Sequence, residues 1–353
     1  MTARRTATVT LVALGIVVAA LALWKIRIVI ALVFLGFIVA AAMRPGVEWL
    51  QLRARVPRTI GVVVHYAAIG GLLALFLWLV VPRAIDQVQQ AVGRVPTTSK
   101  ELHRQASTST GVKHELLTGL EKRLRKLPSG TGLVHPAVEI TKTAFELLVA
   151  IFFTFAVAAY WIFERDRTIG LVQSLVPRRH RRVVRDTWLL IDQKLGAFVR
   201  GELILIVFVA VLLSAGFFVI GLPYWLLLGS FAGVVEIVPV IGPLAAGTLA
   251  IAVGLTESWQ KALAAGLIVL GVRLLEDYLV VPRVLGHAVG LSPLVVLVSV
   301  TAVGILLGGF YVLLAISIAA VLATLVDVVL RDVDPADQEV PTVLFPGAKE
   351  EAG

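Results

Sequence analysis

Long runs of apolar residues alternate along the chain with short polar segments that are rich in arginine. The first half holds four such runs, at residues 6–24, 28–43, 59–82 and 147–163. A membrane-spanning helix needs about 20 mostly apolar residues, and each run approaches that length. The pattern therefore predicts four spans, of which the first two form a tight hairpin because only residues 25–27 separate them.

The first apolar run has two interpretations. Arg4 and Arg5 precede it and Ala20-Leu21-Ala22 resembles a cleavage site, as in a secretory signal peptide. We favour a retained helix, because the run is long for the core of a signal and the second run follows almost at once.

The apolar pattern of the second half is longer and interrupted. Residues 203–256 carry one charge, Glu236, and are long enough for two spans. Another span is expected at 262–281, and residues 284–326 carry no formal charge. We predict an all-α fold, a polytopic transmembrane helical bundle of about eight spans with broken or re-entrant segments in the second half. The alternative is seven or nine spans, with a re-entrant hairpin replacing or joining one of them.

These patterns divide the chain into six parts. The segment after the third span leaves the membrane and carries a leucine stripe typical of an amphipathic helix, at Leu116, Leu120, Leu124 and Leu127. The polar, acidic C-terminal segment has the composition of a disordered tail. The predicted parts are three N-terminal spans (1–82), an extracytoplasmic amphipathic insert (83–139), a fourth span (140–163), a basic cytoplasmic loop (164–200), a C-terminal transport core with broken helices (201–330) and the tail (331–353).

Composition supports a membrane protein and excludes other classes. Apolar residues make up 58% of the 353 residues, charged residues make up 16%, and the mean hydropathy is +0.93. Ordinary globular chains carry about 25% charged residues, so a soluble enzyme, a disordered protein and a coiled coil are excluded. The lack of cysteine excludes disulfides, thiol catalysis and iron–sulfur clusters.

The formal net charge of +9 fits a membrane topology. Lys and Arg gather in cytoplasmic loops, and Arg4, Arg5 and the basic segments 44–58 and 164–200 all fall on one side of the predicted bundle. This predicts a multi-pass protein of the bacterial inner (plasma) membrane with a cytoplasmic N-terminus. The densest basic stretch, 178–182, is expected to contact anionic lipid headgroups, so the expected partner is the lipid bilayer and not nucleic acid.

No motif indicates an enzyme. The Gly-Lys dipeptide is absent, which excludes a Walker A loop, and neither an HExxH nor a GxSxG motif occurs. The six histidines are scattered along the chain. We therefore expect no catalytic residue, no metal site and no cofactor.

One candidate site is a helix break beside Glu236. Pro239 and Pro243, with Gly242 between them, should interrupt the helix, because proline removes a backbone donor and clashes with the preceding turn. Broken backbone within a membrane must line a cavity or be buried in protein, and many transporters bind substrates and ions there. We predict a substrate or ion pathway at these residues. The alternative is a proline kink at a span boundary, with Glu236 at the membrane interface.

A second candidate site lies in the span 262–281. Arg273, Glu276 and Asp277 are three and four residues apart, which places them on one helix face. Charges within a span usually face the bundle interior or a water-filled path. Arg273 can offset one acid, which leaves the other to bind a cation or to carry a proton. The alternative is that this turn lies near the membrane surface, because Pro282 and Arg283 follow closely.

Four segments in order, over roughly residues 185–325, resemble the autoinducer-2 exporter (AI-2E) family, also called PerM-like permeases. The first half agrees with that family in its layout of spans, insert and basic segment. This chain departs from the family pattern at Tyr311, where a glycine is usual, at Ser317, where a proline is usual, and at Glu236, where the family has a polar amide. The segments that carry the resemblance are Phe198-Val199-Arg200-Gly201-Glu202, Glu236-Ile237-Val238-Pro239-Val240-Ile241-Gly242-Pro243, Glu276 with Val281-Pro282-Arg283-Val284-Leu285-Gly286, and Val289-Gly290-Leu291-Ser292-Pro293-Leu294.

The resemblance implies a transporter that moves a small molecule or an ion, typically outward, and that assembles as a homo-oligomer. Members of the family are linked to the autoinducer-2 signal and others to cation–proton exchange. The leading hypothesis is a gradient-driven or passive exporter of a small polar solute. The alternatives are a cation–proton antiporter and a non-transporting membrane scaffold or accessory subunit, whose polar groups serve only helix packing.

Overall fold

The computed structural model describes residues 3–92, 134–238, 241–285, 290–341 and 343. Over these residues the chain is almost wholly helical and contains no β-strand, which confirms the predicted all-α class. The leucine stripe of the predicted insert lies outside the described residues. Five of the described helices are long and apolar enough to cross a membrane: α2 (Arg27–Ala54), α3 (Arg58–Val92), α6 (Val134–Leu175), α7 (Arg181–Val219) and α13 (Gly309–Leu330).

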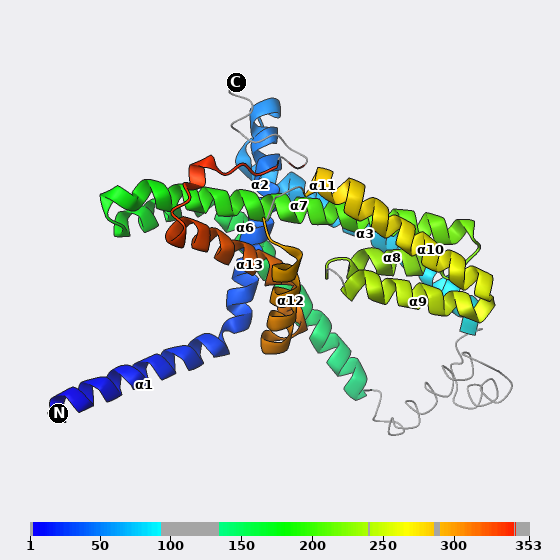
Figure 1. Cartoon of the computed structure of the whole chain (residues 1–353), viewed down its shortest axis with the longest axis horizontal. Helices are drawn as coiled ribbons and strands as arrows, with labels where there is room; N and C mark the ends of the chain where they lie inside the picture. The colour runs from blue at the N-terminus through cyan, green and yellow to red at the C-terminus, as the bar shows by residue number, and fades with distance from the viewer. Residues whose placement is uncertain (1–2, 93–133, 239–240, 286–289, 342, 344–353) are drawn as a thin grey trace.

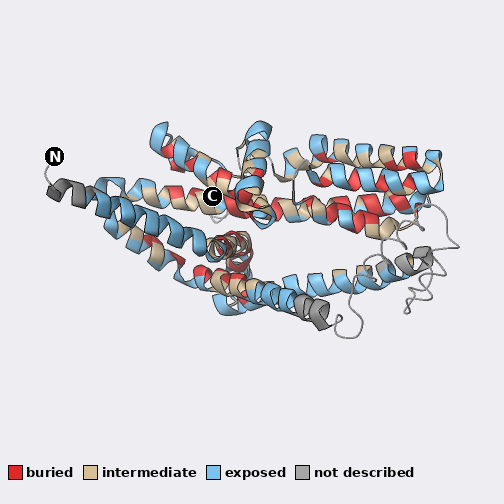
Figure 2. Ribbon diagram, turned by 90° about the horizontal axis from the view of Figure 1, so that it is seen from below, coloured by how far each residue is buried: buried red, intermediate tan, exposed pale blue. Residues whose placement is uncertain are grey.

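Helix α7 runs along the long axis of the molecule, and other helices pack on its two halves (Figure 1). Helices α2, α6 and α13 contact it on one side, and three shorter helices lie along its C-terminal half: α8 (Trp225–Val235), α9 (Ile241–Glu257) and α10 (Trp259–Leu275). Helix α12 (Pro293–Leu307) packs on α13. Helix α1 (Ala3–Lys25) projects from the bundle, and its described side chains are exposed (Figure 2).

The buried residues gather where these helices meet α7 (Figure 2). Phe217 of α7 packs with Leu228 of α8 and Ala265 of α10 in one cluster. Leu195 of α7 packs with Leu314 of α13 in another. The bundle therefore has one core at each half of α7, and each core is closed by a different set of helices.

The segment 164–200 is helical and not a loop, which corrects the sequence expectation. Helix α6 continues to Leu175, and after a short turn and the 3-10 helix Arg178–His180 the chain enters α7. Charges within these helices pair with one another: Arg165 Nε lies 2.5 Å from Asp192 Oδ2, and Arg182 Nε lies 3.4 Å from Asp186 Oδ2. A basic helix and a basic loop have the same low hydropathy, so apolar run length alone does not separate them.

The described part of the tail, which includes a short 3-10 helix at Pro335–Asp337, is held against α7, in contrast to the expected disorder. Lys194 Nζ of α7 donates to Gln338 Oε1 at 2.8 Å, and Arg200 Nε donates to the carbonyl oxygen of Val343 at 2.9 Å. Val343 is only 4% exposed. Buried cations need acceptors, and the tail supplies them to two cations of α7. We name residues 334–343 the C-terminal strap; residues 344–353 lie outside the described part.

Helices α8 and α9 form a short hairpin beside α7 and α10. An 11-residue helix such as α8 is about 16 Å long, which is too short to cross a hydrocarbon core of about 30 Å. Both ends of the hairpin lie at the C-terminal end of α7, because Lys261 Nζ, which follows α9, donates to the carbonyl oxygen of Gly221, which precedes α8, at 2.9 Å. The prediction of broken or re-entrant helices in the second half is confirmed.

Because α8 packs closely on α7, one added methyl group at Gly229 is predicted to lower the stability of the protein. A Cβ at Gly229 of α8 would lie 2.5 Å from the backbone nitrogen of Ser214 in α7, whereas a Cβ at Gly271 of α10 would meet nothing within 4 Å. We expect Gly229→Ala to destabilise the protein by about 1–3 kcal/mol through overpacking. Gly271→Ala should be neutral or slightly stabilising. The measurement is thermal unfolding of both purified variants in one detergent, and equal melting temperatures would contradict the observed packing of α8 on α7.

A second prediction concerns the strap. A hydrogen bond to a charged group contributes about 1.5–3 kcal/mol, so Arg200→Met should release the strap and raise the maleimide labelling rate of Val343→Cys by about tenfold or more. The chain contains no natural cysteine to interfere. Glu339→Cys, which is exposed in the same strap, is the control and should label equally fast with either residue at position 200. An unchanged rate at Val343→Cys would show that Arg200 does not hold the strap.

Candidate functional site

The two candidate sites of the sequence are one cluster in the structure. Arg273 Nη1 lies 3.2 Å from Glu236 Oε1 and 3.0 Å from Glu276 Oε1, and its Nη2 lies 3.0 Å from Asp277 Oδ1. Glu236 comes from the tip of the α8–α9 hairpin, and the other three residues come from the end of α10. We name these four residues the Arg273 cluster.

The position of Glu236 follows from the way the chain turns between α8 and α9. Helix α8 ends at Val235, and the backbone nitrogen of Glu236 still donates to the carbonyl oxygen of Ala232 at 3.1 Å. The chain then turns so sharply that a Cβ at Gly242 would collide with the backbone of Val235. Only glycine allows such a close approach, so Gly242 lets the start of α9 pack against the end of α8, next to Glu236.

The two prolines of the sequence prediction have separate outcomes. Pro243 lies in the first turn of α9, where a missing backbone N–H leaves no hydrogen bond unmade. Pro243 is therefore accommodated in the first turn of α9 and does not interrupt a helix. Pro239 lies outside the described residues.

The other half of the cluster stands on a second irregularity, which the sequence interpretation missed. Residues Glu276–Val280 form one turn of π-helix between α10 and α11 (Val281–Val284), and the backbone nitrogen of Val281 donates to the carbonyl oxygen of Glu276. Such turns are rare and occur often at functional sites. Pro282 was the available signal, because a proline cannot donate to the carbonyl four residues earlier.

Burial divides the four side chains into two inner and two outer groups. Glu236 and Glu276 are 5% and 4% exposed. The side chains of Arg273 and Asp277 are 34% and 45% exposed. The buried centre of the cluster is thus a pair of carboxyl groups, with the guanidinium reaching it from a more open side.

A further acid lies near this centre, on α7. Glu202 lies close enough to both Glu276 and Glu236 to interact with them electrostatically. Arg200, two residues earlier in α7, points away to the strap and to the carbonyl oxygens of Ala41 and Ala42. Together with Glu202, the Arg273 cluster brings four acids near one cation.

This excess of acid determines what the cluster can do chemically. A single guanidinium cannot neutralise two buried carboxylates, and a buried charge without a partner is very costly. One carboxyl group must carry a proton or meet a cation, and neighbouring carboxyl groups commonly share one proton. The arrangement is suited to taking up and releasing a proton or a small cation. Among the described residues, no three His, Cys, Asp or Glu side chains converge as the ligands of a bound metal ion do.

Comparison with known proteins indicates a transporter family. Residues 11–331 match the family model described as AI-2E family transporter. YrrI of Bacillus subtilis (strain 168), which is named as a transport protein, is 24% identical over 86% of this chain and 88% of its own length. MT0215 of Mycobacterium tuberculosis (strain CDC 1551 / Oshkosh), also named as a transport protein, is 26% identical over 87% of this chain and 84% of its own.

The cluster predicts a specific pattern of damage and rescue. Arg273→Met removes the only cation from buried acids, a loss that typically costs about 3–5 kcal/mol and here falls toward the lower value because Arg273 is partly exposed. Adding Glu236→Gln and Glu276→Gln to that variant removes the uncompensated charge, so the melting temperature should recover most of its loss. Arg331→Met, which breaks the more exposed pair with Asp327, is the control and should cost under about 1 kcal/mol. Failure of the two Gln substitutions to rescue would mean that the acids are not held by Arg273.

Proposed function

This chain belongs to the AI-2E transporter family, and from that membership we propose that it exports a small polar solute across the bacterial inner membrane through the Arg273 cluster. Membership and the long apolar helices make it a multi-pass membrane protein of a transporter family. The solute, the direction of movement and the use of a gradient are the proposed part.

One observation carries the proposal: Arg273 joins the tip of a short hairpin to a helix that is interrupted at the same level. Irregular backbone at membrane depth is tolerated only where it lines a cavity or is buried in protein. Substrate and ion sites of transporters lie where two discontinuous helices meet. Glu236 beside the hairpin tip and Glu276 in the π-turn meet both conditions and come from separate elements.

A cation–proton antiporter is the second candidate, and the surplus of carboxyl groups favours it. Arg273 contacts three acids, and Glu202 approaches from α7. Competition between a proton and a cation for the same carboxyl groups is the simplest form of exchange. A non-transporting scaffold is the third possibility, in which the same ion pairs would serve only to hold the hairpin in place.

The placement in the cell and the assembly are also part of the proposal. A cytoplasmic N-terminus puts the basic segments 44–58 and 164–200 on the cytoplasmic side, as the positive-inside rule requires. A homo-oligomer would cover part of the apolar surface of α1 and α3, which is exposed in the single chain.

Glu276→Gln separates the transport hypotheses from the scaffold. The substitution keeps the size and the hydrogen bond to Arg273 but removes the titrating charge. We expect normal expression and a loss of gradient-driven flux by roughly tenfold or more, since each 1.36 kcal/mol of lost coupling is a factor of ten. The measurement is flux of a panel of small polar solutes and monovalent cations in proteoliposomes, with and without a pH or sodium gradient.

Glu257→Gln is the matched control, because Glu257 is an exposed glutamate at the opposite end of α9. It should transport at the unmodified rate. Flux of a small polar solute, with or without a gradient, supports the exporter, and cation flux that reverses with the pH gradient supports the antiporter. Equal flux for Glu276→Gln and the unmodified protein would overturn a role of this cluster in transport.

A further inference from the structure

A second region with the features of a binding site lies at the opposite half of α7. Helices α2, α6, α7 and α13 enclose a cavity of about 450 Å³ that is open on one side. Val183 and Val329, which line it, are 40% and 68% exposed. Ligand cavities in proteins commonly measure about 300–1,000 Å³ and are mostly apolar with a few polar groups. This cavity meets both criteria and takes no part in the Arg273 cluster.

The walls of the cavity favour a hydrocarbon chain. Apart from Thr187 and Asp192, every residue that lines it is apolar. Trp161 and Trp188 stack with ring centroids 5.7 Å apart, and the ring of Phe37 lies 4.3 Å from that of Trp161. A protein helix does not fit, because a helix about 10 Å wide fills this volume in roughly one turn.

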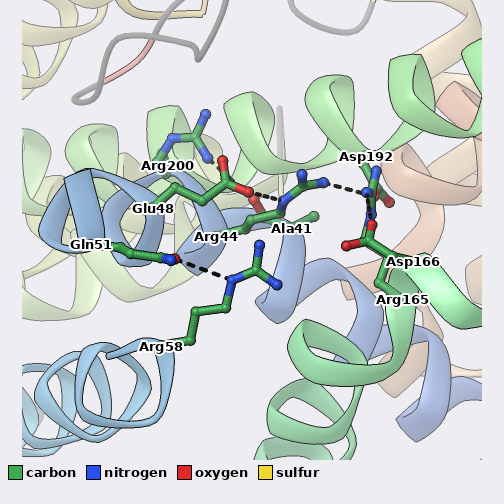
Figure 3. A network of polar contacts seen from close by, with 9 residues as sticks. All are labelled: Ala41, Arg44, Glu48, Gln51, Arg58, Arg165, Asp166, Asp192 and Arg200. Atoms are coloured by element: carbon green, nitrogen blue, oxygen red, sulfur yellow. Dashed lines mark hydrogen bonds and ion pairs between the residues drawn. The ribbon is translucent and has the colours of Figure 1, made fainter. Parts of the chain in front are cut away.

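The one acid in the cavity wall does not repel an anion. Asp192 Oδ2 lies 2.5 Å from Arg165 Nε and 3.9 Å from Arg44 Nη1. Figure 3 shows Arg44 between Asp192 and Glu48, which it contacts at 2.6 Å. Asp192 and Glu48 thus face these two arginines, and the exposed Asp166, 3.3 Å from Arg165 Nη1, is the third acid of the network. Arg165 is 4% exposed, and its Nη2 has no hydrogen-bond partner among the described residues.

One edge of the cavity, at the turn between α6 and α7, is basic. Val172 and Val183 line the cavity on either side of the turn between α6 and α7, and this turn carries Arg178 and Arg179. Arg185 follows within one helical turn of Val183. These three arginines are exposed and form no ion pair with a described residue, whereas the neighbouring Arg182 is paired with Asp186. Uncompensated positive charge therefore stands directly beside an apolar cavity.

An apolar chamber with a cationic edge is complementary to an amphiphile with a negative head. We propose that the cavity binds an acyl chain of an anionic phospholipid from the surrounding bilayer, whose phosphate is held by Arg178, Arg179 and Arg185. A soluble anion would make no use of the apolar walls, and a zwitterionic lipid would leave the three arginines without net compensation. Basic pockets between membrane helices are suited to such headgroups. This site stands on other residues than the transport proposal and holds whether or not the Arg273 cluster transports.

The two tryptophans of the wall provide a direct reporter. The full-length protein is reconstituted in phosphatidylcholine vesicles to which phosphatidylglycerol or phosphatidylcholine with brominated acyl chains is added, since bromine quenches tryptophan fluorescence on contact. We expect brominated phosphatidylglycerol to quench at about tenfold lower mole fraction than brominated phosphatidylcholine. The five other tryptophans (Trp24, Trp49, Trp78, Trp225 and Trp259) are first replaced by Phe, because Trp24, Trp78 and Trp259 are exposed and would be quenched by the bulk lipid. In that background the response should disappear in Trp161→Phe/Trp188→Phe, and neither inorganic phosphate nor glycerol 3-phosphate should compete at millimolar concentration.

Two variants test the two halves of the proposal. Arg178→Gln/Arg179→Gln/Arg185→Gln should abolish the preference for phosphatidylglycerol, while the control Arg53→Gln/Arg55→Gln/Arg58→Gln, with the same change of charge, should keep it. Val184→Phe/Val321→Phe narrows the cavity and should reduce quenching by both lipids.

Several results would overturn the site. Equal quenching by the two lipids would do so, and so would full quenching in Val184→Phe/Val321→Phe. An unchanged preference for phosphatidylglycerol in Arg178→Gln/Arg179→Gln/Arg185→Gln would do so as well, as would a loss of that preference in the control Arg53→Gln/Arg55→Gln/Arg58→Gln. Arg178→Gln/Arg179→Gln/Arg185→Gln alters only exposed side chains, so it still tests the lipid site if Val184→Phe/Val321→Phe fails to fold. Competition by free phosphate would identify a soluble anion as the ligand in place of a lipid.

Discussion

The contacts of Arg273 with Glu236 and Glu276 are the interaction on which the second half of the molecule depends. Each acid stands on a break in a helix, one at the tip of the α8–α9 hairpin and the other in a π-turn. Neither break would be stable in an apolar environment by itself, because each exposes backbone groups and a charged side chain. The guanidinium compensates the charge of both, and in doing so fixes the depth to which the hairpin reaches along α7 and α10.

Helix α7 connects this cluster to the rest of the protein. Its C-terminal half presents Glu202 toward the cluster, and its N-terminal half forms one wall of the apolar cavity. Between them, Lys194 and Arg200 are 8% exposed and take their acceptors from α13, α2 and the C-terminal strap. Two buried cations of α7 thus bind α13, α2 and the C-terminal strap to this helix. A displacement of α7 would therefore alter both the Arg273 cluster and the apolar cavity.

The sequence predicted much of this organisation, because the signals involved are local. The length of an apolar run determines whether a helix can span a bilayer, and glycine and proline interrupt helices wherever they stand. Charged residues inside apolar runs are few, so Glu236, Arg273, Glu276 and Asp277 were visible as candidates without any structure. The family resemblance, the helical class and the interrupted second half follow from the same kind of information.

Only the tertiary structure decided which of these residues act together. Glu236 and Arg273 are 37 residues apart, and their contact depends on the hairpin turning back along α10, which no local pattern specifies. The helices of the segment 164–200 and the order of the strap were missed for a related reason. Their stability comes from ion pairs and hydrogen bonds to other elements, such as Arg165 with Asp192 and Arg200 with Val343, while their own sequence is as polar as a loop. Hydropathy and helix breaks are properties of neighbouring residues along the chain, whereas charge pairing and cavities are properties of surfaces that meet only after the helices have packed.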